Sequence, residues 1–216
     1  MKPDLSLYLV IGTEFAPAGK LKDTIAKAAR GGITAVQLRE KYMPARQYVE
    51  LAKSLKNMLR SRKIPLMIND RVDVALVSGA DGVHLGQSDI DPLSARRILG
   101  KNAIIGLSVE NESQARSALK LPLSYVSASP VFFTSSKNDA ASPLGLEGFS
   151  RIRKIMKDTR LVAIGGINPS NARSVIAAGA DGLCVVSYIC LTTSPFQAAK
   201  NMEKCLAGNK NEAQKA

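Results

Sequence analysis

Short apolar runs alternate with longer amphipathic stretches along almost the whole chain, and this alternation limits the folds that the chain can adopt. Most of the apolar runs are continuous rather than alternating in polarity, which is typical of parallel strands buried on both faces. We expect eight strands, at Leu7–Ile11, Ala35–Leu38, Leu66–Asn69, Val83–Leu85, Ala103–Leu107, Tyr125–Ala128, Leu161–Ile164 and Leu183–Val186.

A helical stretch follows each expected strand. In the longest stretch, apolar residues recur at steps of three and four positions from Tyr48 to Leu59, which gives that helix one apolar face. Eight such units predict an α/β fold, a single (β/α)8 TIM barrel, with an open doubly wound sheet as the alternative. The barrel is expected to span residues 1–207 and to be followed by a polar C-terminal tail at residues 208–216. The expected helices are Leu21–Arg30, Ala45–Arg62, Val72–Ser78, Leu93–Leu99, Ser113–Leu119, Phe149–Lys157, Ser170–Ala178 and Phe196–Leu206.

The tetrapeptide Gly-Ala-Asp-Gly occurs twice, at residues 79–82 and 179–182. Each copy ends an expected helix and opens an expected strand, and its first glycine suits the left-handed conformation that terminates helices. The two strands are the fourth and the eighth, half a barrel apart. Residues at this end of a barrel serve stability rather than catalysis, so we interpret both copies as structural.

The composition excludes several classes of protein. Hydrophobic residues make up 45% of the chain and charged residues 22%, which excludes a disordered or fibrous chain. No stretch reaches the roughly 18–20 uncharged apolar residues of a membrane span, so we expect no membrane partner. An acidic residue, Asp4, precedes the first apolar run, and we therefore expect no secretory signal. Three cysteines, an odd number without metal-ligand spacing, fit a reducing cytoplasm.

The net charge of +12 favours an anionic partner. Nucleic acid is a poor candidate because aromatic residues, which stack on unpaired bases, make up only 5% of the chain. The basic residues are also scattered rather than gathered in a tract. We therefore expect a phosphorylated small molecule and no nucleic acid.

Polar residues follow consecutive expected strands, at the end where barrel enzymes have their active sites. Gly165-Gly166 follows the seventh strand, and Val186-Ser187 lies at the end of the eighth. Free backbone N–H groups at such a turn, and at the helix start near Asn168-Pro169, attract phosphate. We expect a phosphate site at this edge, although the two glycines alone are equally typical of a tight turn.

Two carboxylates, Asp70 and Asp89, follow the third and fourth strands, which are neighbours in a barrel. Mg²⁺ is commonly bound by one or two carboxylates and keeps water and phosphate oxygens as its other ligands, so this pair suits Mg²⁺. For Asp70, capping of the helix Val72–Ser78 is an even alternative, whereas Asp91 is better placed than Asp89 to cap the next helix. The only histidine, His84, lies within a strand, and we interpret it as a packed or hydrogen-bonding residue rather than a catalytic base.

Three cations complete the expected anion site. Arg39 and Lys41 follow the second strand, and Lys137 lies in the long segment after the sixth. An arginine offers a planar fork of donors and a lysine a point charge, and both bind phosphate groups. Together with the glycine turn, they predict two phosphorylated groups, or one monophosphate beside one diphosphate.

These residues resemble a known family. Gln37-Leu38-Arg39-Glu40-Lys41, Asn69-Asp70-Arg71, His84-Leu85-Gly86-Gln87 with Asp89, and Ile164-Gly165-Gly166-Ile167 are similar to motifs of the thiamine-phosphate synthase family, in the same order. The resemblance implies a (β/α)8 barrel that is a Mg²⁺-dependent transferase. Such an enzyme joins 4-amino-2-methyl-5-hydroxymethylpyrimidine diphosphate to a thiazole phosphate and releases diphosphate, through a dissociative path with a pyrimidine cation.

The resemblance also implies a role for each matching position. Arg39, Ser108 and Lys137 are the implied catalytic residues, and Asp70 and Asp89 are the implied Mg²⁺ ligands. The pyrimidine diphosphate would contact Gln37, Leu38, Arg39, Glu40, Lys41, Asn69, Ser108 and Lys137. The thiazole phosphate would contact Thr134, Ser135, Ser136, Gly166, Val186 and Ser187. The sequence departs from the family pattern at Ser127–Pro130, Phe133, Ser136 and Glu110-Asn111.

Two other functions remain as alternatives. A thiazole tautomerase of related fold would bind a thiazole phosphate, but it would not need the Asp70 and Asp89 pair or the full motif Gln37–Lys41. A basic, non-catalytic binding protein would bind nucleic acid with strong salt dependence. The sequence does not determine the oligomeric state.

Overall fold

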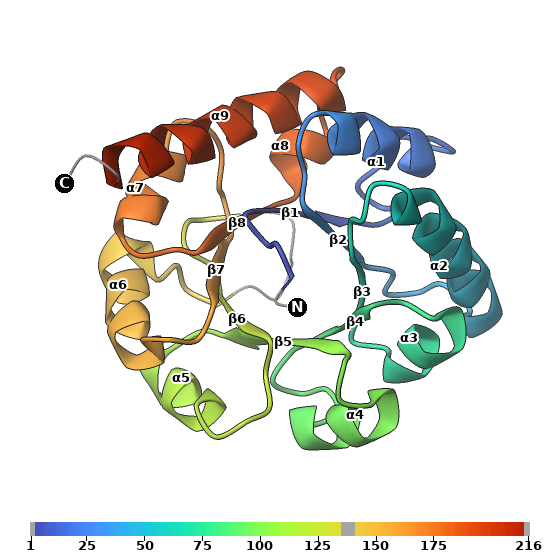
Figure 1. Ribbon diagram of the computed structural model, residues 1–216, viewed down its shortest axis with the longest axis horizontal. Helices are drawn as coiled ribbons and strands as arrows, with labels where there is room; N and C mark the ends of the chain where they lie inside the picture. The colour runs from blue at the N-terminus through green and yellow to red at the C-terminus, as the bar shows by residue number, and fades with distance from the viewer. Residues whose placement is uncertain (1–2, 135–140, 214–216) are drawn as a thin grey trace.

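Eight parallel strands close into one barrel in sequence order, from β1 to β8 and back to β1. A computed structural model of the chain describes residues 3–134 and 141–213 (Figure 1). The predicted TIM barrel is confirmed, and the open sheet is excluded. The strands are β1 (Leu7–Ile11), β2 (Ala35–Leu38), β3 (Leu66–Asn69), β4 (Gly82–Leu85), β5 (Ile104–Val109), β6 (Tyr125–Ala128), β7 (Leu161–Ile164) and β8 (Gly182–Val185).

In the described part of the chain, helices surround the barrel, one after each strand and two after β8 (Figure 1). The four-residue helix α8 was not expected, because one turn is too short to show a helical period. The helices are α1 (Leu21–Arg30), α2 (Ala45–Arg60), α3 (Val72–Ser78), α4 (Pro92–Leu99), α5 (Glu112–Ala118), α6 (Gly145–Met156), α7 (Ala172–Ala177), α8 (Ser187–Cys190) and α9 (Pro195–Ala213).

Each strand is buried on both faces, which explains its continuous apolar sequence. In β1, Leu7, Leu9 and Ile11 belong to the large core beneath the helices, whereas Tyr8 and Val10 belong to a smaller core inside the barrel. Successive side chains of a strand point to opposite faces, so alternate residues of every strand point into the barrel. Polar side chains can therefore lie inside the barrel without interrupting the strand.

Two strands end at other residues than predicted, and for β5 this is the reason. β5 continues to Val109, because Ser108 pairs with Ser127 and Val109 with Ala128 of β6. Ser108 thus lies within β5, not after it as expected, and faces the barrel interior. β8 ends at Val185, and the backbone turns at Val186 to begin α8.

The last helix, α9, packs against α1 and α7 and closes the ring (Figure 1). It continues past the expected end at Leu206 to Ala213, so the expected tail starts within a helix, and its last three residues lie outside the described part. Once Ala198, Ala199 and Met202 anchor the helix in the core, each further residue adds a backbone hydrogen bond. Within the described residues, no helix is both long enough and apolar enough to cross a bilayer.

The two Gly-Ala-Asp-Gly segments lie at the opposite end of the barrel from the polar strand ends. Gly79 and Gly179 have positive φ angles of 68° and 104°, as helix-terminating glycines do. The Asp81 carboxylate accepts the Leu66 N–H at 2.8 Å and pairs with Lys56. Both segments therefore fasten one strand to the next, as their structural interpretation predicts.

Candidate active site

A cavity of about 410 Å³ opens at the C-terminal ends of the strands, and all eight strands or the loops after them contribute to its wall. Its size suits a small-molecule site. Eleven of the predicted residues line it: Gln37, Arg39, Lys41, Asn69, Asp70, Asp89, Ser108, Thr134, Gly166, Val186 and Ser187. The structure thus brings most of the predicted side chains to one cavity.

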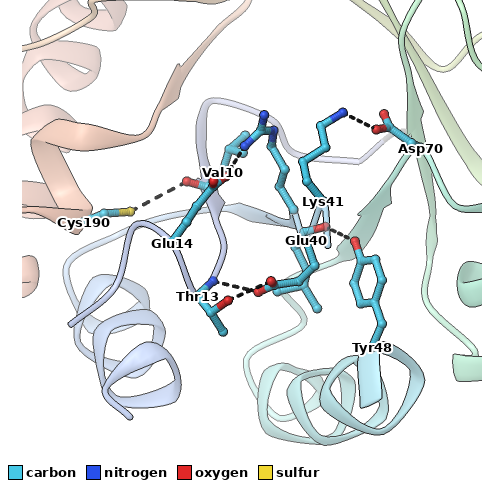
Figure 2. A network of polar contacts seen from close by, with 10 residues as sticks. Val10, Thr13, Glu14, Glu40, Lys41, Tyr48, Asp70 and Cys190 are labelled. Carbon is cyan, nitrogen blue, oxygen red and sulfur yellow. Dashed lines mark hydrogen bonds and ion pairs between the residues drawn. The ribbon is translucent and has the colours of Figure 1, made fainter. Parts of the chain in front are cut away.

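Two predicted substrate contacts, Leu38 and Glu40, do not line the cavity. Leu38 is fully buried on the outer face of β2, because Gln37 before it faces inward. The Glu40 carboxylate accepts hydrogen bonds from the N–H of Thr13 at 2.7 Å and from its hydroxyl at 2.8 Å (Figure 2). Glu40 therefore holds the loop after β1 in place, and these two side chains are not available to a ligand in this conformation.

Three predicted residues, Ser135, Ser136 and Lys137, lie outside the described residues. Their assignments remain predictions. Thr134, directly before them, lines the cavity.

Asp70 and Asp89 face each other across the ends of β3 and β4. Burial raises the pKa of Asp89 above its usual range, and the nearby Asp70 carboxyl raises it further. The Asp89 carboxylate accepts the Gly86 N–H at 2.7 Å. The Lys41 ammonium lies 2.7 Å from Asp70 Oδ2 (Figure 2). Two carboxyl groups close enough for one to raise the pKa of the other favour a cation between them.

Helix capping does not account for either acid. The residue before α3 is Arg71, whose side chain makes no capping hydrogen bond, and the Asp70 side chain points to Lys41 instead. Asp91 caps α4 by accepting the Ser94 N–H at 2.9 Å, as predicted. Asp70 also has a positive φ of 61°, a conformation that aspartate adopts more readily than most residues.

The acid pair fits the donor set of Mg²⁺. Among the described residues, no group of three or more His, Cys, Asp or Glu side chains gathers around one point. Mg²⁺ is commonly held by one or two carboxylates and completes its shell with water and substrate phosphates. Asp70 and Asp89 supply such a pair at the rim of a cavity that also contains cations.

Arg39 and Lys41 both line the cavity, and each pairs with an acid. The Arg39 guanidinium forms an ion pair with Glu14 and lies 5.7 Å from the centre of the Phe15 ring. Lys41 pairs with Asp70. The loop after β1 therefore contributes two residues, Glu14 and Phe15, that orient Arg39 and that the sequence did not identify.

The turn after β7 leaves no room for side chains. Gly165 and Gly166 have φ angles of 104° and 64°, and a Cβ on Gly166 would lie 2.6 Å from the Phe133 carbonyl oxygen. The Asn168 and Asn171 side-chain amides both donate to the Gly166 carbonyl, at 3.3 and 2.9 Å. The two asparagines fix the turn, and sequence reasoning had assigned neither side chain a role.

A chain of hydrogen bonds crosses the barrel and forms part of the cavity wall. The Gln37 amide donates to the Tyr8 hydroxyl at 2.9 Å, and the Tyr8 and Tyr125 hydroxyls are 2.9 Å apart. His84 lies between Tyr125, 2.8 Å from its Nδ1, and Ser108, 2.9 Å from its Nε2. The interpretation of His84 as a buried hydrogen-bonding residue is confirmed.

Comparison with known proteins gives one consistent result. The family described as thiamine monophosphate synthase matches residues 7–189. The thiamine-phosphate synthase of Albidiferax ferrireducens is 48% identical over 203 residues, which are 94% of this chain and 92% of that protein. The thiamine-phosphate synthase of Leptospira biflexa is 49% identical over 196 residues, 89% of this chain and 93% of that protein.

A solved structure agrees with these sequences. The thiamine phosphate pyrophosphorylase from Pyrococcus furiosus superposes with a TM-score of 0.86 at 34% identity, covering 96% of this chain and 98% of the other. The similarity therefore extends over the whole barrel, including the strand ends that form the cavity.

Proposed function

Since the chain belongs to the thiamine monophosphate synthase family, we propose how its cavity carries out the reaction of that family. The activity is that of a thiamine-phosphate synthase, a transferase that joins a pyrimidine diphosphate to a thiazole phosphate and releases diphosphate. The observation that supports the mechanism best is the position of the acid pair, the cations and the glycine turn around one cavity.

The pyrimidine diphosphate would occupy the side of the cavity formed by β2 to β5. Gln37 and Asn69 line the cavity there and would contact the pyrimidine end of the substrate, and Ser108 would lie near the bond that breaks. Arg39 and Lys41, with Lys137, would bind the diphosphate through their positive charges. Arg39 would exchange its partner Glu14 for phosphate oxygens when the substrate binds.

Asp70 and Asp89 would hold Mg²⁺, which supplies a positive charge that stabilises the negative charge of a leaving diphosphate. The side chains of this protein act beside it. Arg39, Lys41 and Lys137 would stabilise the same oxygens as the bond between the pyrimidine methylene carbon and the diphosphate oxygen breaks. The electron pair of that bond leaves with the diphosphate.

The thiazole phosphate would bind at the ends of β7 and β8. Its phosphate would lie against the backbone of Gly166 and near Val186 and Ser187, where backbone N–H groups favour an anion. Thr134, Ser135 and Ser136 would supply hydroxyl donors from the loop after β6. The thiazole nitrogen would then attack the pyrimidine methylene cation, which the amino group of the pyrimidine stabilises, so no protein nucleophile is required.

The state of the thiols supports a reducing compartment. Cys184, Cys190 and Cys205 are all free, and two of them are buried. Free thiols persist in a reducing compartment, and we place the enzyme in the cytoplasm, with small molecules as its partners.

An assay of thiamine phosphate formation from the two substrates tests the proposal. Product should form with Mg²⁺ and should fall to background when EDTA removes the metal. Undiminished turnover in EDTA would exclude the role of Asp70 and Asp89 as Mg²⁺ ligands, and no product under any metal condition would exclude the activity.

A further inference from the structure

The hydrogen-bond chain inside the barrel joins five side chains from five strands: Gln37, Tyr8, Tyr125, His84 and Ser108. Four of them are nearly inaccessible to solvent, and Ser108 at the end is partly exposed in the cavity. Among the described residues, no buried side-chain nitrogen or oxygen lacks a partner. Such fully satisfied networks hold their members in one arrangement.

The chemistry of the members gives the chain one direction. The Gln37 nitrogen can only donate, so the Tyr8 oxygen accepts this bond and gives its single hydrogen to Tyr125. Tyr125 in turn gives its hydrogen to Nδ1 of His84. Burial raises the pKa of both tyrosines, which keeps both hydroxyl hydrogens in place.

This direction determines the tautomer of His84. A ring nitrogen that accepts a hydrogen bond carries no proton, so the proton of the neutral ring resides on Nε2. Nε2 then donates to the Ser108 hydroxyl oxygen at 2.9 Å. Because that oxygen is an acceptor toward His84, the hydroxyl hydrogen of Ser108 is left for the cavity.

We propose that Tyr8, Tyr125 and His84 are positioning residues whose one-way hydrogen-bond chain makes Ser108 a hydrogen-bond donor to the bound pyrimidine diphosphate. The identity of this ligand rests on the proposed function. The acceptor is an oxygen of the leaving diphosphate, where negative charge grows as the bond to the methylene carbon breaks. A donor aimed at developing charge contributes more in the transition state than in the substrate complex.

The opposite direction makes a different prediction. If Ser108 donated to Nε2, the histidine proton would reside on Nδ1, and the serine would offer only lone pairs to the ligand. The two directions therefore differ in the tautomer of one ring. His84 is the only histidine of the chain, so its ring nitrogens give one unambiguous set of NMR signals.

The first experiment records long-range ¹H–¹⁵N spectra of the full chain, uniformly labelled with ¹⁵N, at neutral pH. A protonated Nε2 and an unprotonated Nδ1 are expected. The Nδ1–H tautomer or a doubly protonated ring would overturn the proposal. This result does not depend on turnover, so it stands even if the assay finds no thiamine phosphate and the proposed function fails.

The second experiment breaks the chain with Tyr125→Phe. The fraction of the Nε2–H tautomer should fall, and kcat should drop roughly three- to tenfold, the size of one hydrogen bond. The KM for the thiazole phosphate should not change. Ser108→Ala should lower kcat at least as much, and the double variant should be no slower than Ser108→Ala, because Tyr125 acts through Ser108. Additive losses would show that Tyr125 acts in some other way and would overturn the proposal.

A matched control is Tyr48→Phe. Tyr48 is also a fully buried tyrosine that donates a hydrogen bond, at 2.6 Å to the Leu38 carbonyl, but it belongs to α2 and packs in the core outside the barrel. This variant should lose stability without changing the histidine tautomer.

If Tyr125→Phe does not fold, Tyr8→Phe breaks the chain one link further away and should also lower the Nε2–H fraction and kcat. An unchanged tautomer and an unchanged kcat in Tyr8→Phe would count against the chain.

Discussion

Aspartates lie at both ends of this barrel, and their surroundings differ. At the N-terminal ends of the strands, Asp181 accepts the Leu161 N–H at 2.7 Å and pairs with Arg153 at 2.8 Å. At the C-terminal ends, Asp89 faces Asp70, and its pKa is raised. The first arrangement neutralises its charge within the protein, whereas the second leaves negative charge that an added cation would neutralise.

Two glycines with positive φ, Gly79 and Gly166, show a similar contrast. Gly79, at the N-terminal end, has open space where a side chain would project. Gly166, at the C-terminal end, is surrounded so closely that a Cβ would collide with the backbone of Phe133. One end of the barrel therefore uses these residues to end helices and join strands, and the other uses them to build a site at some cost in stability.

The largest expected effect comes from removing an acid of the cavity. Asp89→Ala and Asp70→Asn should each lower turnover by at least about a hundredfold at limiting Mg²⁺, as loss of a catalytic metal ion would. Asparagine is the better replacement at position 70, because it tolerates the positive φ of 61° there. Steady-state assays over a range of Mg²⁺ concentrations, with circular dichroism to confirm folding, measure this. Near-normal turnover of either variant at limiting Mg²⁺ would remove that residue from the metal site.

A smaller effect, a weaker binding of the thiazole phosphate, is expected from a substitution in the glycine turn. Gly166→Val should raise the KM for the thiazole phosphate at least about tenfold, because its side chain occupies the close approach that glycine permits, with less change in the KM for the pyrimidine diphosphate. Titration of each substrate at saturation of the other separates the two constants. Equal weakening of both would indicate general distortion rather than a phosphate site.

Gly79→Ala is the matched control for this substitution. Gly79 has a similar φ of 68° but nothing within 4 Å of an added Cβ. Its replacement should cost about 1 kcal/mol of stability from backbone strain and leave both KM values unchanged. A change in either KM would break the proposed division between the two ends of the barrel.

Removing an acid from the other end should affect stability alone. Asp181→Ala leaves the Leu161 N–H and Arg153 without this partner, and should lower the free energy of unfolding by about 1–2 kcal/mol with kcat unchanged. Urea unfolding measures the loss. Asp158→Ala, at an exposed aspartate, is the control and should stay within about 0.5 kcal/mol of the wild type. A clear fall in kcat for Asp181→Ala would contradict the structural interpretation.

Residue patterns that repeat along one strand or helix predicted much of this molecule. The eight strands followed from apolar runs, and the acid pair followed from two aspartates after neighbouring strands, since the ends of adjacent strands converge. The side chains of Leu38 and Glu40 do not line the cavity. A motif matched as five consecutive letters does not predict this, because it ignores the alternation of side chains that points Leu38 away from the cavity.

Features that depend on contacts between distant strands could not be predicted in this way. The Tyr8 and Tyr125 hydroxyls meet inside the barrel although the residues are far apart in sequence, and only the closure of the barrel brings them together. Asn171 lies beside the Gly166 carbonyl because the turn after β7 folds back, and no local pattern encodes that contact. Inward-facing tyrosines at alternate strand positions were the one signal that could have suggested the hydrogen-bond chain.

The smallest expected effect is on the free energy of unfolding, and it tests how Asp89 of the acid pair contributes to stability. The raised pKa of Asp89 means that the folded protein binds this proton more tightly than the unfolded chain does. As the pH rises through the folded pKa, the ionised group therefore lowers the stability of the metal-free protein.

Asp89→Asn removes this charge, and its side-chain oxygen can still accept the Gly86 N–H. In EDTA at neutral pH, its free energy of unfolding should equal or exceed that of the wild type by up to about 0.5 kcal/mol, since solvent screens part of the repulsion. The stabilisation of the wild type by added Mg²⁺ should be absent in the variant. A variant that is less stable in EDTA would show that Asp89 holds the fold together as Asp181 does, and the contrast between the two ends of the barrel would not hold for this residue.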